Sequence, residues 1–90
     1  MNITIITKND CEPCETVKDI LKKEGYVYAT IQYEEWKREV GEFMRLNDIH
    51  HFPMILESGE YLGSGIMAAH KVDPDINLVE HLKRGGRNEK

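Results

Sequence analysis

The chain contains only two cysteines among its 90 residues, and both lie in one Cys-x-x-Cys motif, Cys11 and Cys14. A single pair cannot form the disulfide framework of a small secreted domain. A bond between residues three apart closes too short a loop to restrain the unfolded chain appreciably. Structural cross-linking is therefore the weakest interpretation of the pair. Redox chemistry and metal binding remain, and both suit a reducing compartment.

Long apolar runs and a leader segment are also missing. A membrane-spanning helix needs about 20 apolar residues, whereas the apolar runs of this chain extend over only a few residues. The first ten residues lack the basic segment, apolar core and cleavage site of a secretory signal. The formal net charge of -4 argues weakly against nucleic acid as the main partner. We therefore expect a cytoplasmic monomer that binds neither membrane nor nucleic acid.

The length suits one small domain, since no repeat, low-complexity stretch or linker interrupts the sequence. We expect this domain to cover residues 1–84 and a flexible tail to follow over residues 85–90.

The first half of the chain predicts two strands and two helices. β-branched residues favour a buried strand over 2–7 and a second strand over 26–33. Helical spacing begins at Glu12, with Pro13 in the first turn and Gly25 suited to the end of the helix. Its apolar face consists of Cys14, Val17, Ile20 and Leu21. A second helix over 34–48 would direct Trp36, Val40, Phe43 and Met44 to the core.

The second half predicts a hairpin and a third helix. Strands over 52–57 and 60–65 flank the turn dipeptide Ser58-Gly59, and Met54 and Met67 are expected to pack internally. In the segment 73–86, Asp73 or Asp75 would cap a helix whose core residues are Ile76, Val79 and Leu82. The element order is β-α-β-α-β-β-α. It predicts an α/β domain with a four-stranded mixed sheet and three flanking helices.

The position of the cysteine pair favours redox chemistry. Cys11 follows a strand and begins a helix, where the helix dipole and free N–H groups stabilise a thiolate. Cys14 lies one turn later on the apolar face, as expected for a buried resolving thiol. Lys8 adds a nearby positive charge, but three acidic residues surround the thiols and oppose thiolate formation: Asp10, Glu12 and Glu15. A weakly stabilised thiolate makes a reducing couple, so we expect a donor of electrons.

A metal site is the alternative that the residues leave open. Cys11, Cys14, His50 and His51 have the composition of a Cys₂His₂ zinc site. Adjacent histidines rarely bind one ion, however, and zinc-finger histidines are separated by about 3–5 residues. The two histidines are instead expected in the loop before the third strand, where His51 would lie near the active cysteine.

The motifs together resemble the glutaredoxins, which have the thioredoxin-like fold. The resemblance rests on "TKNDCEPC" after a strand, on "HFPMI" about forty residues later, and on "YLGSG" after the hairpin. It covers about residues 2 to 83. It implies that Cys11 attacks and Cys14 resolves a mixed disulfide, and that Pro53 is cis. The substrate contacts that it implies involve Lys8, Pro13, Phe52, Pro53, Ser64 and Gly65.

The sequence departs from the glutaredoxin pattern at two places that affect the expected binding of glutathione. The residues between the cysteines are Glu-Pro, whereas glutaredoxins usually have Pro-Tyr. The proline directly before the second cysteine is similar to the arrangement in thioredoxin. The family's Gly-Gly-x-Asp element, which holds the γ-glutamyl end of glutathione, corresponds here to Gly63-Ser64-Gly65-Ile66. The carboxylate that would pair with the glutathione ammonium is therefore missing. Loss of this contact is also a feature of the glutaredoxin-like proteins that reduce ribonucleotide reductase and are recharged by thioredoxin reductase.

The sequence therefore predicts a dithiol glutaredoxin-like disulfide oxidoreductase without a bound cofactor. Glutathione is the expected co-substrate, with thioredoxin reductase as the alternative electron donor. The resemblance implies ribonucleotide reductase as the client. The rival hypotheses are an iron–sulfur or zinc binding module that uses Cys11, and a monothiol deglutathionylase.

Overall fold

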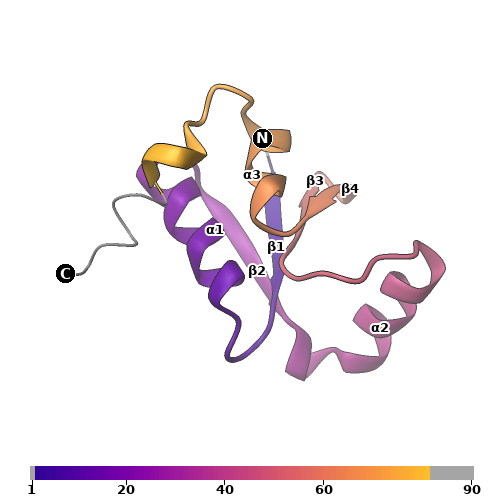
Figure 1. Ribbon diagram of the computed structural model, residues 1–90. Helices are drawn as coiled ribbons and strands as arrows, with labels where there is room; N and C mark the ends of the chain where they lie inside the picture. The colour runs from indigo at the N-terminus through magenta and orange to yellow at the C-terminus, as the bar shows by residue number, and fades with distance from the viewer. Residues whose placement is uncertain (1, 82–90) are drawn as a thin grey trace.

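A computed structural model describes residues 2–81 and shows a four-stranded mixed sheet with helices on both faces (Figure 1). The predicted order of strands and helices is confirmed, with two short 3-10 helices added. The elements are β1 (Ile3–Thr7), α1 (Glu12–Lys23), β2 (Tyr28–Gln32), η1 (Tyr33–Glu35), α2 (Lys37–Leu46), β3 (Met54–Glu57), β4 (Glu60–Ser64), η2 (Ile66–Ala68) and α3 (Ala69–Val72). Within these residues no helix is long and apolar enough to cross a membrane.

The sheet has the strand order β2-β1-β3-β4, so β1 is central. β1 and β2 run parallel because α1 carries the chain from the end of one strand back to the start of the next. β3 is antiparallel to both β1 and β4. The turn between β3 and β4 consists of Ser58 and Gly59, both at positive φ as a tight hairpin requires. The central strand therefore leads directly into the Cys-x-x-Cys segment.

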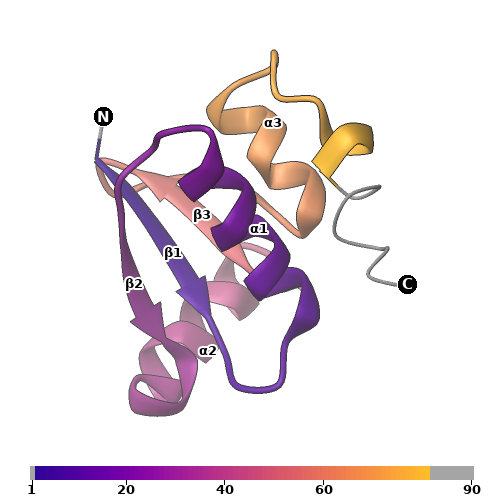
Figure 2. The ribbon, with the colours of Figure 1, turned by 90° about the vertical axis from the view of Figure 1, so that its left-hand side faces the viewer.

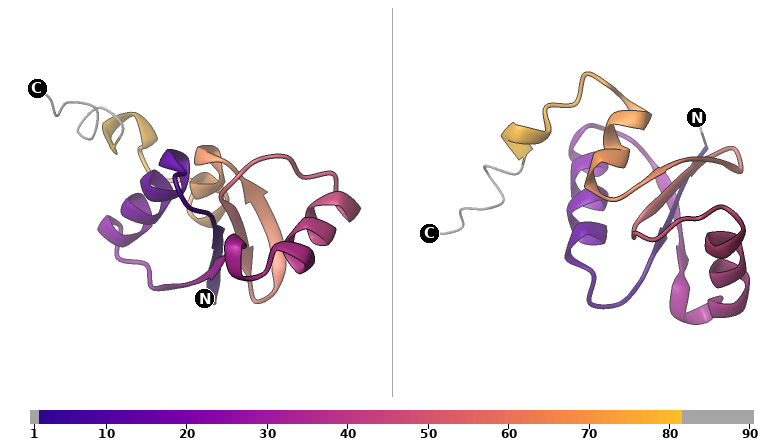
Figure 3. Two further views of the ribbon diagram at one scale, coloured as in Figure 1. Left: turned by 90° about the horizontal axis from the view of Figure 1, so that it is seen from below. Right: turned by 45° about the vertical axis from the view of Figure 1, so that its right-hand side comes forward.

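The helices form two layers around this sheet. α1 and α3 lie on one face and α2 lies on the opposite face (Figures 2 and 3). Alternation along β1 divides the core accordingly. Ile5, which is opposite Ile55, packs with Leu21 and other residues of α1, whereas the next residue, Ile6, packs with Val40 of α2.

The start and end of α1 follow the sequence expectations. Cys11 is the N-cap in an extended conformation, and Pro13 lies in the first turn. Gly25 follows the helix at φ 89°, a left-handed conformation that glycine adopts without the steric cost of a side chain. The apolar face of α1 is buried as predicted, with Cys14, Val17, Ile20 and Leu21 at most 1% exposed.

The prediction of Trp36 as a core residue is wrong, because its exposed fraction is 51%. The predicted helix over 34–48 begins later, at Lys37, and residues 33–35 form the 3-10 helix η1. Trp36 is thus the N-cap of α2, outside the periodicity on which the prediction depended. Met67, also predicted to pack internally, is 63% exposed within η2. The predictions for Val40 and Met54 are confirmed.

The third helix differs most from its prediction. α3 covers Ala69–Val72, before the expected segment, and Asp73 follows it as the C-cap. A separate helical turn over 78–81 follows Asn77, whose Oδ1 accepts the Glu80 N–H at 3.0 Å. This places Leu78 in the core in place of Val79, which is 73% exposed. Ile76 is buried as predicted. Leu82, the boundary at residue 84 and the tail over 85–90 lie outside the described residues.

The Tyr26 hydroxyl connects the segment before β2 with the C-cap of α3 by donating to Asp73 Oδ2 at 2.9 Å. This hydrogen bond, with desolvation and the Asp73 charge, raises the pKa of Tyr26 above its usual value of 10.0. A raised pKa means that the contribution to stability is present below pH 10.0 and is lost as the pH rises through the folded-state pKa. Tyr26→Phe should therefore lower the melting temperature at pH 7, and the difference from the wild type should disappear in strongly alkaline buffer.

Tyr61→Phe is the matched control for this substitution. The Tyr61 ring packs edge-on against Phe43, and its hydroxyl has no hydrogen-bond partner among residues 2–81. Removal of the Tyr61 hydroxyl should leave the melting temperature nearly unchanged both at pH 7 and in strongly alkaline buffer, as measured by circular dichroism. An equal decrease in melting temperature at pH 7 in the two variants would contradict a stabilising role for the Tyr26–Asp73 hydrogen bond.

Candidate active site

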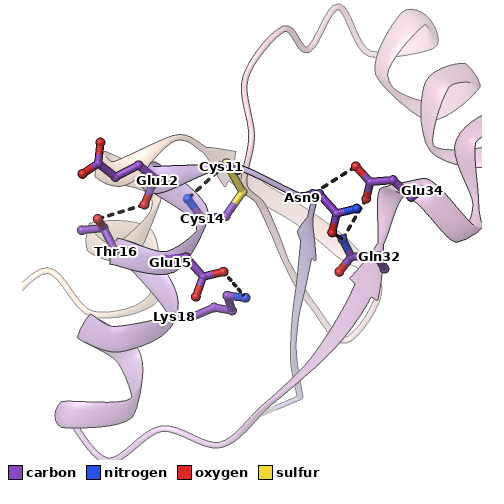
Figure 4. The surroundings of a disulfide bond; sticks show 9 residues. All are labelled: Asn9, Cys11, Glu12, Cys14, Glu15, Thr16, Lys18, Gln32 and Glu34. Carbon is purple, nitrogen blue, oxygen red and sulfur yellow. Dashed lines mark hydrogen bonds and ion pairs between the residues drawn. A yellow bond between two sulfur atoms is a disulfide. The ribbon is translucent and has the colours of Figure 1, made fainter.

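Cys11 and Cys14 form a disulfide at the N-terminus of α1 (Figure 4), with 5.3 Å between their Cα atoms. Cys11 Sγ is also the cap of the helix, since it accepts the Cys14 backbone N–H at 3.2 Å. Cys11 is 7% exposed and Cys14 is fully buried. The two cysteines therefore differ in exposure, and Cys11 is the more exposed of the pair.

The N-terminus of α1 favours negative charge at the Cys11 sulfur. The helix has 12 residues, so its first turn presents free N–H groups and the positive end of the dipole. A Cys11 thiolate in the same position would accept the Cys14 N–H that the sulfur accepts in the disulfide. The geometry thus supplies the hydrogen bond and the field that lower a thiol pKa.

The three acidic neighbours of the cysteines lie on the surface. Asp10, Glu12 and Glu15 are all exposed, and Glu15 forms an ion pair with Lys18 at 2.8 Å. Solvent screens exposed charges, and the ion pair offsets one of them. The opposition of these residues to the Cys11 thiolate is therefore weaker than their number in the sequence suggests.

Lys8, three residues before Cys11, lies against Phe52. The Lys8 Nζ lies over the Phe52 ring at 5.0 Å from its centroid, a cation–π contact. The Tyr33 ring meets the same ring edge-on at 5.3 Å. Lys8 is exposed and the two rings are half-buried, so the cation and the aromatic pair form an accessible surface.

The peptide bond between Phe52 and Pro53, directly before β3, is cis, as the family resemblance implies. Pro53 is buried, and its carbonyl accepts the Gly65 N–H at 2.8 Å. Gly65 has φ 79°, a conformation that a side chain would strain. This bond holds the turn after β4 next to the cis-proline. Ser64, Gly65 and Ile66 are half-buried there, whereas Pro13 is exposed on α1.

The two histidines considered for metal binding lie in the loop before β3, as expected. His50 Nε2 is 2.8 Å from Asp48 Oδ1, and both His50 and His51 are exposed. Among residues 2–81, no three side chains of His, Cys, Asp or Glu are grouped closely enough to hold a metal ion. Cys11, Cys14, His50 and His51, weighed above as an alternative zinc site, therefore do not form a Cys₂His₂ arrangement in this structure.

A polar network beside the cysteines was missed by the sequence analysis. Asn9 N–H donates to Glu34 Oε2 at 3.0 Å, and the Gln32 side chain donates both to Glu34 Oε1 at 2.7 Å and to Asn9 Oδ1 at 2.9 Å (Figure 4). Asn9 is 25 residues from Glu34 in sequence. No local pattern links them, because their proximity follows from the parallel pairing of β1 with β2. The register pairs Thr7 with Gln32 and so sets the segments after both strands side by side.

Comparison with known proteins shows a family match over most of the fold. The glutaredoxin family model matches residues 3–62. This segment contains β1, the cysteine pair, Pro53 and most of β4. No curated protein sequence matches the chain.

Solved structures give the same fold. The glutaredoxin-like protein NrdH-redoxin of Escherichia coli is 25% identical with a TM-score of 0.68, covering 80% of this chain and 92% of that protein. A glutaredoxin of Brucella melitensis is 21% identical with a TM-score of 0.67, covering 94% of this chain and 91% of that one. Glutaredoxin 1 of Francisella tularensis is 20% identical with a TM-score of 0.62, covering 82% and 92% respectively.

Proposed function

The chain belongs to the glutaredoxin family and is a dithiol thiol–disulfide oxidoreductase, and from this premise we propose that it reduces protein disulfides through Cys11, with electrons from thioredoxin reductase. The observation that carries the proposal is the asymmetry of the pair. Cys11 caps α1 and is 7% exposed, whereas Cys14 is fully buried. The reaction needs no bound prosthetic group, because the electrons pass between sulfur atoms.

The proposed reaction transfers two electrons in two exchanges. The Cys11 thiolate attacks one sulfur of the substrate disulfide, which breaks the S–S bond and releases one substrate thiolate. The Cys14 thiolate then attacks Cys11 Sγ, which releases the second substrate thiolate and forms the Cys11–Cys14 disulfide. The departing thiolates take up protons from water. An external dithiol restores the reduced pair by the same exchanges in reverse.

Substrate contacts are proposed for the other residues that the family resemblance implies. An extended chain would lie along the Phe52 backbone before Pro53 and pair with it as an added strand. Lys8 would hold a carboxylate, and the backbone of Ser64 and Gly65 would hold another polar end. Pro13 would form the exposed rim on the α1 side.

The choice of donor rests on Ile66. The family position that would pair with the glutathione ammonium holds this half-buried apolar side chain, which packs against the core. The described E. coli relative, 25% identical, is a glutaredoxin-like protein with a thioredoxin-like activity profile. Both observations favour thioredoxin reductase over glutathione. Ribonucleotide reductase in the cytoplasm is the proposed client, and this choice rests on the family resemblance alone.

The donor is tested by following NADPH loss in the presence of the oxidised protein. One arm contains thioredoxin reductase, and the other contains glutathione with glutathione reductase. Thioredoxin reductase should support turnover, whereas glutathione should be much slower at equal protein concentration. The reverse order would mean that Lys8, Phe52 and Gly65 suffice for glutathione, and the donor assignment would then be wrong. The client is tested by adding oxidised ribonucleotide reductase as the only final electron acceptor.

A substitution at Ile66 tests the reason for this preference. Ile66→Asp should raise glutathione turnover by about tenfold, since a charge-assisted hydrogen bond is worth about 1.5–3 kcal/mol. The asparagine of Ile66→Asn is similar in volume and polarity to the aspartate of Ile66→Asp but carries no charge. This variant should therefore increase glutathione turnover little. Equal rates for the two variants would show that the missing carboxylate does not limit glutathione use.

A further inference from the structure

The network of Asn9, Gln32 and Glu34, here called the Glu34 clamp, is a closed ring of hydrogen bonds. Glu34 uses both carboxylate oxygens, one for the Asn9 backbone N–H and one for the Gln32 amide. Gln32 also donates to Asn9 Oδ1, so each of the three residues contacts the other two. Figure 4 shows that the clamp lies on the β2 side of the cysteine pair, opposite the side from which α1 extends.

The clamp holds the segment that carries Cys11. β1 ends at Thr7 and α1 begins at Glu12, so the intervening residues 8–10 are in neither element, and all three are exposed. Asp10, directly before Cys11, has φ 52°, a conformation that costs a non-glycine residue energy. The disulfide joins Cys11 to the helix alone and does not reach this segment. When the disulfide opens, the clamp still fastens Asn9 to the end of β2.

We propose that Glu34, with Gln32 and Asn9, is a positioning residue of the thiol chemistry that keeps the reduced Cys11 sulfur at the N-cap of α1. The inference rests on the proposed role of Cys11 as the attacking thiol. In the reduced protein, Cys11 has no covalent tie to Cys14, and its thiolate is stabilised only while it faces the first-turn N–H groups. Fixing Asn9 two residues earlier limits the orientations that Cys11 samples.

The charge state of Glu34 agrees with this role. Partial desolvation acts to raise the pKa of its carboxyl group. The hydrogen bonds from Asn9, Gln32 and the Glu34 backbone, together with the Lys37 charge, outweigh this effect and leave the pKa below its usual value of 4.5. Glu34 is therefore ionised near neutral pH, as an acceptor of two donors must be.

The test compares Glu34→Gln with Glu35→Gln. Glu35 is the next residue in η1 and is exposed, and it takes no part in the clamp. Each variant removes one negative charge, but only Glu34→Gln replaces an acceptor oxygen with an NH₂ group that faces a donor. The rate of iodoacetamide alkylation is measured against pH for the reduced protein, with the modified cysteine identified by mass spectrometry.

Glu34→Gln should raise the Cys11 thiol pKa and slow alkylation at neutral pH by about threefold or more relative to Glu35→Gln. Removal of a nearby negative charge alone acts in the opposite direction, so a general electrostatic effect cannot imitate this result. Gln32→Ala removes two of the three hydrogen bonds with no change of charge, and it should shift the pKa in the same direction. The melting temperatures of all three variants show that each remains folded.

Two results would separately contradict the positioning role of the Glu34 clamp and the role of Cys11 as the attacking thiol. Equal thiol pKa values and rates in Glu34→Gln and Glu35→Gln, with Cys11 modified in both, would overturn the clamp and leave the proposed function intact. Preferential modification of Cys14 in the wild type would instead overturn the role of Cys11 as the attacking thiol.

Discussion

Cys11→Ser is expected to abolish disulfide reduction, with a loss of about three orders of magnitude or more, because a serine hydroxyl is not ionised near neutral pH and cannot replace the thiolate. Cys14→Ser should fail differently. Cys11 still attacks, but no second thiol releases the substrate, so a mixed disulfide with Cys11 accumulates. Mass spectrometry after incubation with a peptide disulfide should detect this adduct in Cys14→Ser and not in Cys11→Ser.

The two variants serve as controls for each other, since both replace one thiol by a hydroxyl within the same motif. Both are expected to remain folded, which circular dichroism checks. An adduct on Cys14 in Cys11→Ser would contradict the order of attack that burial of Cys14 implies. Sustained turnover of Cys14→Ser with glutathionylated substrates would support the monothiol mechanism in place of the dithiol cycle.

The parts of the fold that the sequence predicted correctly depend on local signals. The face of α1 follows from the spacing of Cys14, Val17 and Leu21, and its end follows from Gly25. The cap position of Cys11 follows from the change between strand and helix periodicity. The cis bond before Pro53 came from the family resemblance, because only about 5–6% of such bonds in folded proteins are cis.

The errors arose where the true start of a helix differs from the start that the periodic pattern assumed. Trp36 stands at a spacing that fits a buried face, but α2 begins after it, at Lys37. Val79 lies within the helical turn over 78–81, but this turn starts after Asn77 and buries Leu78, so Val79 is exposed. α3 was missed because Ala69–Val72 is too short to show a helical period. Helix boundaries here depend on capping contacts and tertiary packing, which single-residue preferences encode poorly.

The active site likewise contains residues that the sequence predicts and residues that only the fold brings together. Cys11, Cys14 and Pro53 are marked by their motifs, whereas the Glu34 clamp has no sequence signature. Asn9, Gln32 and Glu34 are ordinary polar surface residues until the pairing of β1 with β2 brings them together. The cation–π contact between Lys8 and Phe52 is likewise a product of the fold, since 44 positions separate the two residues (52 − 8). Prediction of such contacts requires the strand register.

Leu21→Ala is expected to cause the largest loss of stability. Leu21 is fully buried on the face of α1 that also carries Cys14, and it packs in the cluster that includes Ile5 and Ile55. The substitution removes apolar contact and leaves a cavity, at a cost of about 2–5 kcal/mol. For a domain of this size, stability is about 5–15 kcal/mol. The melting temperature should fall by about 10–25 °C, as measured by calorimetry.

Leu46→Ala makes the same chemical change on another helix, at a side chain that is 68% exposed. Its cost should be within about 0.5 kcal/mol, so the difference between the variants isolates burial from helix propensity. Well below its melting temperature, Leu21→Ala should retain a thiol pKa near that of the wild type, because the cap and the clamp are intact. A variant with both a lower stability and a thiol pKa above that of the wild type would instead show that packing of α1 on the sheet, beyond the contacts at its N-terminus, positions the Cys11 sulfur.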